Sequence, residues 1–530
     1  MNILNSNDIN ILDLPDEILS IIFNKLNTID IFYSLVDVNH RFDRLSLDSL
    51  VIHHLDFAIE RSHVHNSSVD TYILDKVCSK ILPQINDKIT KLTLDPFSTE
   101  RILSAVKYPQ LHSLSLVNYQ SHILLRHLKD GVISFLNDQI TDLTVDIYHD
   151  KGELSDKLET IVFVAILFYC RYLTDLNFSQ KFSSNYLSFV SCDILQGCSL
   201  SSSLTNLTIK VNSFNDCLHL LNECLQYLST LIIRIKKISR PSSNINNKEK
   251  LCKLKCFSLV GEQYSYCYDT LVVPLLRRML NLEELSLQLS VIRAKTSYID
   301  GNQLYEQVLK YLPRLNKFMF NIHTHIINTR IDSDLPSNDD IRNSFIKQGF
   351  QLVGTCATKI FRNNGGDCHV YSLPYPFSDF LFLSNCFQGG QFNKVRILMM
   401  LDRYPFEHKL FKIISEDFPF LQKLIILNLK EQKNDQHHSS TLITFNHLLK
   451  LNLISAHNAY ATLFLSDRST RLPCLTNLKI RYSTLASVTN NFTNDETRLN
   501  CAKIKSLYVR DLTVHSQNFN SYFPSLCDFS

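Results

Sequence analysis

Residues 271–287 read LVVPLLRRMLNLEELSL, and this stretch combines two elements that recur along most of the chain. Its first part, LVVPLLRRMLN, is helix-like. Its second part, LEELSL from Leu282, follows the pattern Φ-x-x-Φ-x-Φ, in which Φ is an apolar residue. The last two apolar positions of the pattern alternate, as they do in a strand with one buried face. The stretch therefore predicts a helix followed by a strand.

The same six-residue pattern occurs fourteen times, with 22 to 33 residues between successive starts except for one gap. The units start at Ile89, Leu111, Ile140, Leu173, Leu204, Leu228, Leu254, Leu282, Leu315, Phe392, Leu421, Leu448, Leu475 and Ile504. A proline stands two residues before four of these starts, at Pro109, Pro313, Pro419 and Pro473, where it ends a helix before the strand. One strand and one helix in about 20–30 residues is the signature of a leucine-rich repeat.

The first fifty residues differ from the rest and predict three short helices. Residues 14–48 read LPDEILSIIFNKLNTIDIFYSLVDVNHRFDRLSLD. Pro15 suits the first turn of the first helix, and Thr28 can cap the second. The apolar residues of the three helices are Ile18, Ile22 and Leu26, then Ile31, Leu35 and Val38, then Phe42 and Leu45. Because so small a core is marginal alone, this module is expected to complete it against a partner.

Residues 14–48 resemble the F-box domain. The resemblance is carried by Leu14, Pro15, Asp16, Glu17, Ile18, Ile22, Leu26, Asp30, Leu35, Val38, Asn39, Arg41 and Phe42. Phe42 stands where the family frequently has tryptophan, and it preserves a large apolar side chain. The resemblance implies that the module binds the small adaptor of SCF-type cullin–RING ubiquitin ligases. The adaptor-binding residues that it implies are Leu14, Pro15, Ile18, Ile22, Leu26, Ile31, Leu35, Val38 and Phe42.

The remainder of the chain resembles the leucine-rich solenoids that are often joined to F-boxes. The family's asparagine, three residues past the last apolar position, is present only at Asn212. We therefore predict an α/β protein in which a small three-helix F-box precedes a curved leucine-rich-repeat solenoid with an all-parallel strand layer. The expected boundaries are 10–50 for the F-box, 51–84 for a helical linker and 85–530 for the solenoid. An irregular insertion is expected near 321–391.

The residues between the apolar strand positions are expected to point away from the core, onto the concave surface of such a solenoid. The first five units place both signs of charge there, at Lys91, Asp95, Asp142, Asp146, Asp175 and Lys210. The last five units place only basic residues there, at Lys394, Arg396, Lys423, Lys450, Lys479, Arg481 and Arg510. Lys394, Lys423 and Lys450 are predicted to be equivalent on strands about 4.8 Å apart, where like charges repel and an anion would relieve the repulsion. The alternative is a solvated face kept soluble by lysine.

Residues that suggest catalysis or metal binding have simpler interpretations. Cys368-His369 suggests a thiol nucleophile, but adjacent side chains rarely point at each other, so a buried cysteine in a turn is favoured. The tripeptide Gly389-Gly390-Gln391 is interpreted as a turn. A zinc site built from Cys252, Cys256, Cys267, His437 and His438 lacks the spacing of a known zinc module. No cofactor, metal or catalytic residue is predicted.

Composition and the amino terminus favour an intracellular protein. The 54 Lys and Arg nearly balance 51 Asp and Glu, so bulk charge gives no reason to expect nucleic acid. The amino terminus lacks the pattern of a secretory signal, and the longest apolar run, 161–169, is too short to span a bilayer. The fifteen cysteines form no framework, as is usual in a reducing compartment. The expected location is cytoplasmic, nuclear or both, without a membrane partner.

These observations favour a non-catalytic substrate receptor of an SCF-type ubiquitin ligase. The F-box would bind the adaptor and so the cullin, and the concave face would hold a target protein, acidic or phosphorylated. One rival is a leucine-rich-repeat scaffold or ligand sensor without a ubiquitin ligase role. A second rival, a nucleic-acid binder, lacks the basic residues interleaved with aromatics that such proteins use.

Overall fold

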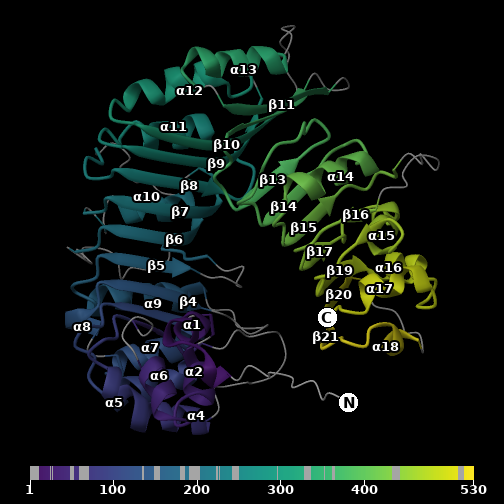
Figure 1. The fold of residues 1–530 in the computed structure, drawn as a ribbon. Helices are drawn as coiled ribbons and strands as arrows, with labels where there is room; N and C mark the ends of the chain where they lie inside the picture. Colours follow the sequence, from purple (N-terminus) through teal and green to yellow (C-terminus); the bar gives the residue numbers. More distant parts are fainter. Residues whose placement is uncertain are drawn as a thin grey trace. The chain divides into compact units, whose positions relative to one another are not determined.

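The computed structural model of this chain divides into two compact units. The first holds Met1–Arg61, Asn66–Gln288 and Val308–Phe318, and the second holds Leu289–Gln307 and Met319–Ser530. The structure describes residues 11–23, 25–26, 28–47, 53–58, 71–133, 136–147, 156–179, 186–189, 203–221, 225, 227–240, 250–294, 297–327, 336–350, 352–360, 365–432, 442–510 and 518–529. The class is α/β, as predicted, with helices against large and mostly parallel sheets (Figure 1).

Three short helices begin the first unit: α1 (Asp16–Phe23), α2 (Thr28–Ser34) and α3 (His40–Ser46). Pro15 lies directly before α1, and its carbonyl accepts the N–H of Ile18 and of Leu19 at 3.1 Å. The rings of Phe23 and Phe42 meet edge to face, with their centroids 5.6 Å apart. Among the described residues of this helical module, the buried apolar side chains are Leu19, Phe23, Ile31, Phe32, Val36, Phe42 and Leu45.

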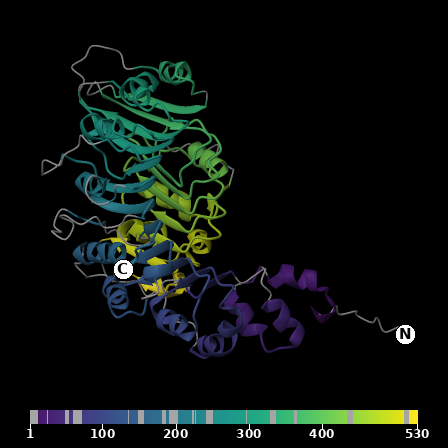
Figure 2. The same cartoon turned by 90° about the vertical axis from the view of Figure 1, so that its left-hand side faces the viewer.

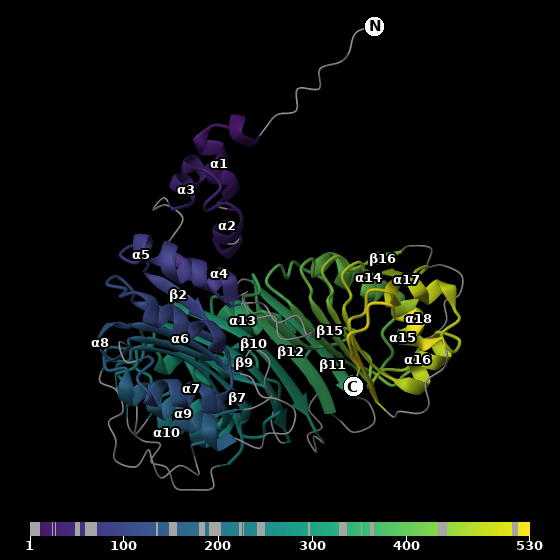
Figure 3. The ribbon, with the colours of Figure 1, turned by 90° about the horizontal axis from the view of Figure 1, so that it is seen from below.

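A parallel sheet follows, with its strands in the order of the sequence. Its strands are β1 (His54–Asp56), β2 (Lys91–Leu94), β3 (Ser113–Tyr119), β4 (Asp142–Ile147), β5 (Asp175–Ser179), β6 (Asn206–Ser213), β7 (Thr230–Lys237), β8 (Cys256–Gly261) and β9 (Glu284–Arg293). The helices of this part are α4 (Thr71–Lys76), α5 (Leu82–Ile85), α6 (Pro96–Ala105), α7 (Ser121–Lys129), α8 (Leu136–Gln139), α9 (Asp156–Tyr169), α10 (Phe214–His219) and α11 (Val273–Leu276). Helices α6, α7, α9 and α10 lie along one face of the strands (Figure 3), and Figure 2 shows strands and helices as two layers.

The pattern in the sequence predicted which side chains form this core. In every unit except those at Leu315 and Phe392, all three apolar residues of the pattern are buried. The strands pair so that the middle residue of one unit lies beside the middle residue of the next, as Leu92 does with Leu114 and Leu207 with Leu231. The apolar run at 161–169 is the second part of α9, in which Val162, Phe163 and Ile166 are buried. The core therefore lies between the strands and the helices that cover one of their faces.

The parallel order ends in the second unit, where the prediction of an all-parallel layer is wrong. The sheet continues through β10 (Lys317–Ile326) to β12 (Gly365–Ser372) and then β11 (Val353–Ile360). β12 is antiparallel to both of its neighbours. Its His369 lies opposite His323 of β10 on one side and opposite Cys356 of β11 on the other. Only four residues separate β11 from β12 in the sequence, a length that suits a hairpin and is too short for a parallel crossover. The segment 321–391, predicted to be irregular, therefore contains paired strands.

Helices α12 (Gly301–Gln307) and α13 (Asn338–Lys347) accompany the hairpin, and Phe345 of α13 stacks on Phe320 with ring centroids 5.1 Å apart. The opposite face of the hairpin meets a cluster of aromatic rings. Tyr371 lies in this cluster with Phe380 and Phe392, at centroid distances of 5.3 and 5.9 Å. The cluster belongs to the core of a second, seven-stranded sheet.

The second sheet is parallel throughout. Its strands are, in order, β13 (Asp379–Leu383), β14 (Ile397–Leu401), β15 (Lys423–Leu427), β17 (Lys450–Asn452), β19 (Asn477–Arg481), β20 (Ser506–Arg510) and β21 (Asp528–Phe529). A separate pair is formed by β16 (Ile443–Thr444) and β18 (Thr470–Arg471). The helices are α14 (His408–Asp417), α15 (Asn458–Leu465), α16 (Tyr482–Val488), α17 (Arg498–Cys501) and α18 (Phe519–Tyr522). Figure 3 shows α15 and α16 on one side of this sheet.

One predicted register in this sheet is wrong by three residues. Leu398 lies beside Leu424, so Val395 takes the place predicted for Phe392. The sequence VRILMM from Val395 fits the apolar pattern as well as FNKVRI does. Phe392 instead stacks on Phe418 in the aromatic cluster, with ring centroids 4.7 Å apart. The packing of a large ring therefore decides between two registers that the pattern alone leaves equal.

Candidate protein-docking surfaces

Arg41 holds the start of the helical module against its third helix. Its Nη1 donates to the carbonyl of Leu12 at 2.6 Å, its Nη2 donates to the carbonyl of Leu14, and its Nε donates to Asp16 at 2.7 Å. The hydrogen bond from Arg41 is the largest cause that lowers the pKa of the Asp16 carboxyl. Asn39 caps α3 by accepting the N–H of Phe42 at 2.8 Å. These polar residues therefore fix the positions of the apolar ones.

The helical module exposes a set of large apolar side chains, which we call the module surface. They are Ile11, Leu12, Ile18, Ile21, Leu26 and Val38, each between 42% and 57% exposed. Ile18 and Ile21 are one turn apart on α1, so they share one side of the helix. Contiguous exposed apolar side chains mark interaction sites, and Ile18 with Ile21 forms such a pair on α1.

The predicted adaptor-binding residues divide between this surface and the interior. Pro15, Ile18, Leu26 and Val38 are exposed, whereas Leu14, Ile22 and Leu35 are half-buried. Ile31 and Phe42 are buried in the module's own core, so these two of the predicted residues pack within the module. A module of so few residues needs its large side chains to fill its own core. Ile11, Leu12 and Ile21 were not among the predicted residues. The adjacent pair Ile21-Ile22 is the signal in the sequence for a second apolar side of α1.

The second candidate surface is the face of the seven-stranded sheet that α14, α15 and α16 do not cover. Its basic residues, which we call the basic face, are Lys423, Lys450, Lys479, Arg481 and Arg510. Lys423 lies directly beside Lys450, and Arg481 lies beside Arg510. The pKa of Lys423 is lowered by burial first, and then by the charges of Lys450 and Lys479. The face therefore disfavours its own positive charge.

Two neighbouring groups extend the basic face. The ammonium of Lys479 lies 5.2 Å from the centroid of the Tyr508 ring on β20. Arg481 donates through Nη2 to the carbonyl of Ala456 at 2.7 Å, while its buried Nε has no acceptor among the described residues.

Lys394 and Arg396 lie outside this row, so the predicted equivalence of Lys394 to Lys423 is wrong. Both precede β14, and the residue beside Lys423 is Ile397. Arg396 donates to the carbonyl of Asn393 at 2.7 Å, and its guanidinium lies 5.1 Å from the centroid of the Phe420 ring. The three-residue difference in register explains both displacements.

The first sheet corrects two of the acids predicted on its outer face. Asp95 caps α6, accepting the N–H of Phe97 at 3.0 Å and of Ser98 at 2.8 Å. Asp146 is buried near the end of β4. Asp142 remains exposed, and Asp175 accepts from Asn206 at 2.6 Å.

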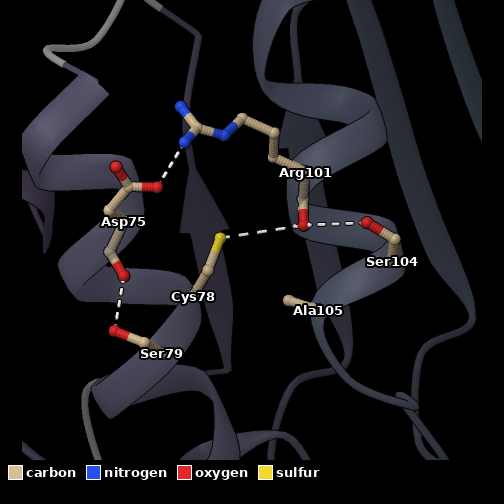
Figure 4. Close-up of a pocket in the computed structure, with 6 residues that line it drawn as sticks. All are labelled: Asp75, Cys78, Ser79, Arg101, Ser104 and Ala105. Atoms are coloured by element: carbon tan, nitrogen blue, oxygen red, sulfur yellow. Dashed lines mark hydrogen bonds and ion pairs between the residues drawn. The ribbon is translucent and has the colours of Figure 1, made fainter.

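A pocket of about 410 Å³ lies between the turns after α4 and helix α6 (Figure 4). It is lined by Asp75, Cys78, Ser79, Arg101, Ser104 and Ala105. Arg101 pairs with Asp75 across it, and the Cys78 thiol donates to the carbonyl of Arg101 at 3.7 Å. Burial raises the pKa of that thiol. The polar groups satisfy one another, so nothing in the pocket points to a ligand.

The other predicted chemical groups have structural roles where they are described. Cys368 is buried in β12, and burial raises the pKa of its thiol, so the group is not an activated nucleophile. Gly389 and Gly390 have φ of 95° and 151°, as a glycine turn requires. Of the residues considered and rejected as zinc ligands, Cys267 is buried, Cys256 is half-buried, Cys252 is exposed, and His437 and His438 lie outside the described residues.

Within the described ranges, no three His, Cys, Asp or Glu side chains gather as a metal site requires. Among the described helices, none has the length and apolar character needed to cross a membrane.

No model of a known protein family matches this chain. A comparison with proteins of curated function also found no match. The function is therefore argued from the two surfaces themselves.

Proposed function

We propose that this protein is the substrate receptor of an SCF-type ubiquitin ligase. In this proposal the helical module is an F-box that docks the ligase adaptor, and through it the cullin. The strand-and-helix units form a divergent leucine-rich-repeat solenoid that holds a target protein. The other ligase subunits supply the chemistry, so this chain acts by binding two proteins at once.

The observation that carries the proposal is the exposed module surface on a very small core. Burying one large apolar side chain contributes roughly 1.5–3 kcal/mol before the costs of association. Several such side chains on one module suffice for a specific complex. The resemblance of residues 14–48 to the F-box names the class of partner. Two of the matching residues, Asn39 and Arg41, stabilise the module.

The first prediction tests adaptor docking with Ile18→Ser and Ile21→Ser combined in the full chain. Both side chains are exposed on one side of α1, so the module should stay folded while its docking surface becomes polar. Recovery of the adaptor and cullin with the affinity-purified chain should fall roughly tenfold or more. Circular dichroism and hydrogen exchange of residues 16–46 check the fold.

The matched control replaces Phe168, which is exposed on α9 of the first sheet, with serine. It removes an exposed large apolar side chain at another place, and adaptor recovery should stay as in the parent. If the parent chain captures neither adaptor nor cullin, the rival function of a scaffold or sensor without a ligase role is the correct one. Equal recovery with the parent and the double variant would instead reject the module surface as the docking site.

A further inference from the structure

The outer face of the seven-stranded sheet is divided into an apolar part and the basic face. The apolar part consists of Ile397, Met399 and Leu401 on β14 and of Ile425 and Leu427 on β15, all half-buried. Met399 lies beside Ile425, and Leu401 lies beside Leu427. Ile397 lies beside Lys423, so the apolar part borders the basic face directly. A ligand that spans both parts must combine aliphatic groups with negative charge.

Strand positions explain why the basic face favours an anion. Neighbouring strands are about 4.8 Å apart, so Lys423 beside Lys450 and Arg481 beside Arg510 each place like charges close together. On β15, β17, β19 and β20 the outward positions of the described residues hold no acid. Besides the basic and apolar residues, the outward residues there are Asn452, Asn477, Ser506 and Tyr508. On β13, at the edge of the same sheet, Asp379 lies beside Ile397, and its charge acts to raise the pKa of Lys423. An acidic ligand placed over β15 to β20 would thus meet positive charge and neutral hydrogen-bonding groups.

The chemistry of the apolar part favours a protein segment over a nucleic acid. Bases bind by stacking on aromatic side chains, whereas this part is made of isoleucine, leucine and methionine. Such side chains complement other aliphatic side chains. The span from β14 to β20 crosses four strand intervals, about 20 Å at 4.8 Å each. About six residues of an extended peptide cover that length.

We propose that this face binds an extended acidic segment of a target protein, in which aliphatic residues lie beside the acidic ones. The aliphatic residues contact Met399, Ile425 and Leu427, and the anionic groups contact Lys450, Lys479 and Arg481. This inference rests on the proposed function, because it takes the outer face of the sheet to be where targets bind. The anionic groups are carboxylates or phosphates, which share this chemistry.

The test selects linear twelve-residue peptides from a random displayed library with the full-length chain. We expect the selected peptides to combine Asp or Glu with Leu, Ile, Met or Val in adjacent positions. A selected peptide is then labelled, and its affinity is measured by fluorescence anisotropy. Lys450→Ser combined with Lys479→Ser should weaken binding about tenfold or more. Ile425→Ser combined with Met399→Ser should remove the aliphatic preference and retain the acidic one.

The matched control is Lys409→Ser combined with Lys412→Ser, which removes the same charge from positions on α14. This control should bind as the parent does. In a further arm, phosphoserine replaces one acidic residue of the peptide, and tighter binding assigns the anion as phosphate whereas weaker binding assigns it as carboxylate.

Three results would overturn the inference: selection of no peptides or of basic ones, equal loss of affinity in the α14 control, or tighter binding of a single-stranded oligonucleotide through the same lysines. Adaptor recovery with the same variants separates the two proposals. If peptide selection fails while adaptor recovery persists, only this inference is lost. If adaptor recovery fails while peptides still bind, the ligase function is lost and the peptide site stands.

Discussion

Two histidines are held without charge in the interior of the second unit. His323 on β10 and His369 on β12 face each other with ring centroids 5.5 Å apart, and His323 also stacks on Phe382. Burial lowers the pKa of His323 to about 4 and the pKa of His369 well below its usual value. Asn321 accepts from His369 and donates to the hydroxyl of Tyr375 at 2.6 Å. Acid should therefore weaken this region.

The second prediction is that stability falls between about pH 6.5 and pH 4, where an unfolded imidazole binds a proton but buried His323 does not. Because the unfolded state binds more protons there, the free energy of unfolding decreases as the pH falls. Between about pH 7 and pH 5, His323 alone accounts for a loss of about 2 kcal/mol. His323→Phe keeps the ring and removes that loss.

Native-state hydrogen exchange of the β10 and β12 amides, followed across this pH range, measures the effect. The free energies of opening measured for the variant and the parent should change in parallel above about pH 7 and diverge below it. Parallel behaviour down to pH 5 would mean that His323 binds protons equally in the folded and unfolded states, contrary to its burial.

At the scale of elements, the guanidinium of Arg41 is the group that ties the segment before α1 to α3. Arg41 joins the carbonyls of Leu12 and Leu14 to α3, so it holds the chain segment before α1 in a fixed position. Arg44 also pairs with Asp16, but its side chain is largely exposed. The two arginines therefore offer a matched comparison.

The third prediction is that Arg41→Gln destabilises the helical module by about 1–2 kcal/mol, after allowance for solvent at a partly exposed site. Arg44→Gln should cost well under 1 kcal/mol, because exposed ion pairs contribute little. Hydrogen exchange of the α1 amides measures both, and adaptor recovery should weaken in the same order. A larger effect from Arg44→Gln would contradict the role assigned to Arg41.

At the scale of the whole molecule, the two compact units each contain a core of their own. Leu207 and Leu231 belong to the first sheet, whereas Leu451 and Leu478 belong to the core of the second. In proteins built from stacked units, each unit contacts mainly its neighbours, and local stability varies along the chain.

The fourth prediction is that Leu451→Ala lowers the free energy of unfolding of the second sheet by about 2–5 kcal/mol while the β6 and β7 amides keep their protection. Leu207→Ala, a deletion of the same size at an equally buried site, should have the converse effect. Hydrogen exchange by mass spectrometry resolves both sheets in one sample. Loss of protection in both sheets from either substitution would show that the chain unfolds as one cooperative unit.

The sequence by itself determined most of the parallel strands, the side chains that they bury, and the helical start of the chain. These features are local, because burial of one face imposes a period of two on a strand and a helix needs its own apolar spacing. Thus the burial of Leu92, Leu207 and Leu451, the middle apolar residues of their units, was predictable. The position of Lys423 beside Lys450 was predictable too.

Only the tertiary structure decided the features that depend on contacts between distant residues. Phe392 lies outside the strand because it packs against the rings of Phe418 and Phe380. Lys394 therefore lies outside the row of lysines. Phe42 points into the module because its ring packs against Phe23 in the small core. The direction of β12 was likewise set by pairing, which no single strand's pattern encodes. In each case two arrangements satisfy the local pattern equally, and long-range packing selects one.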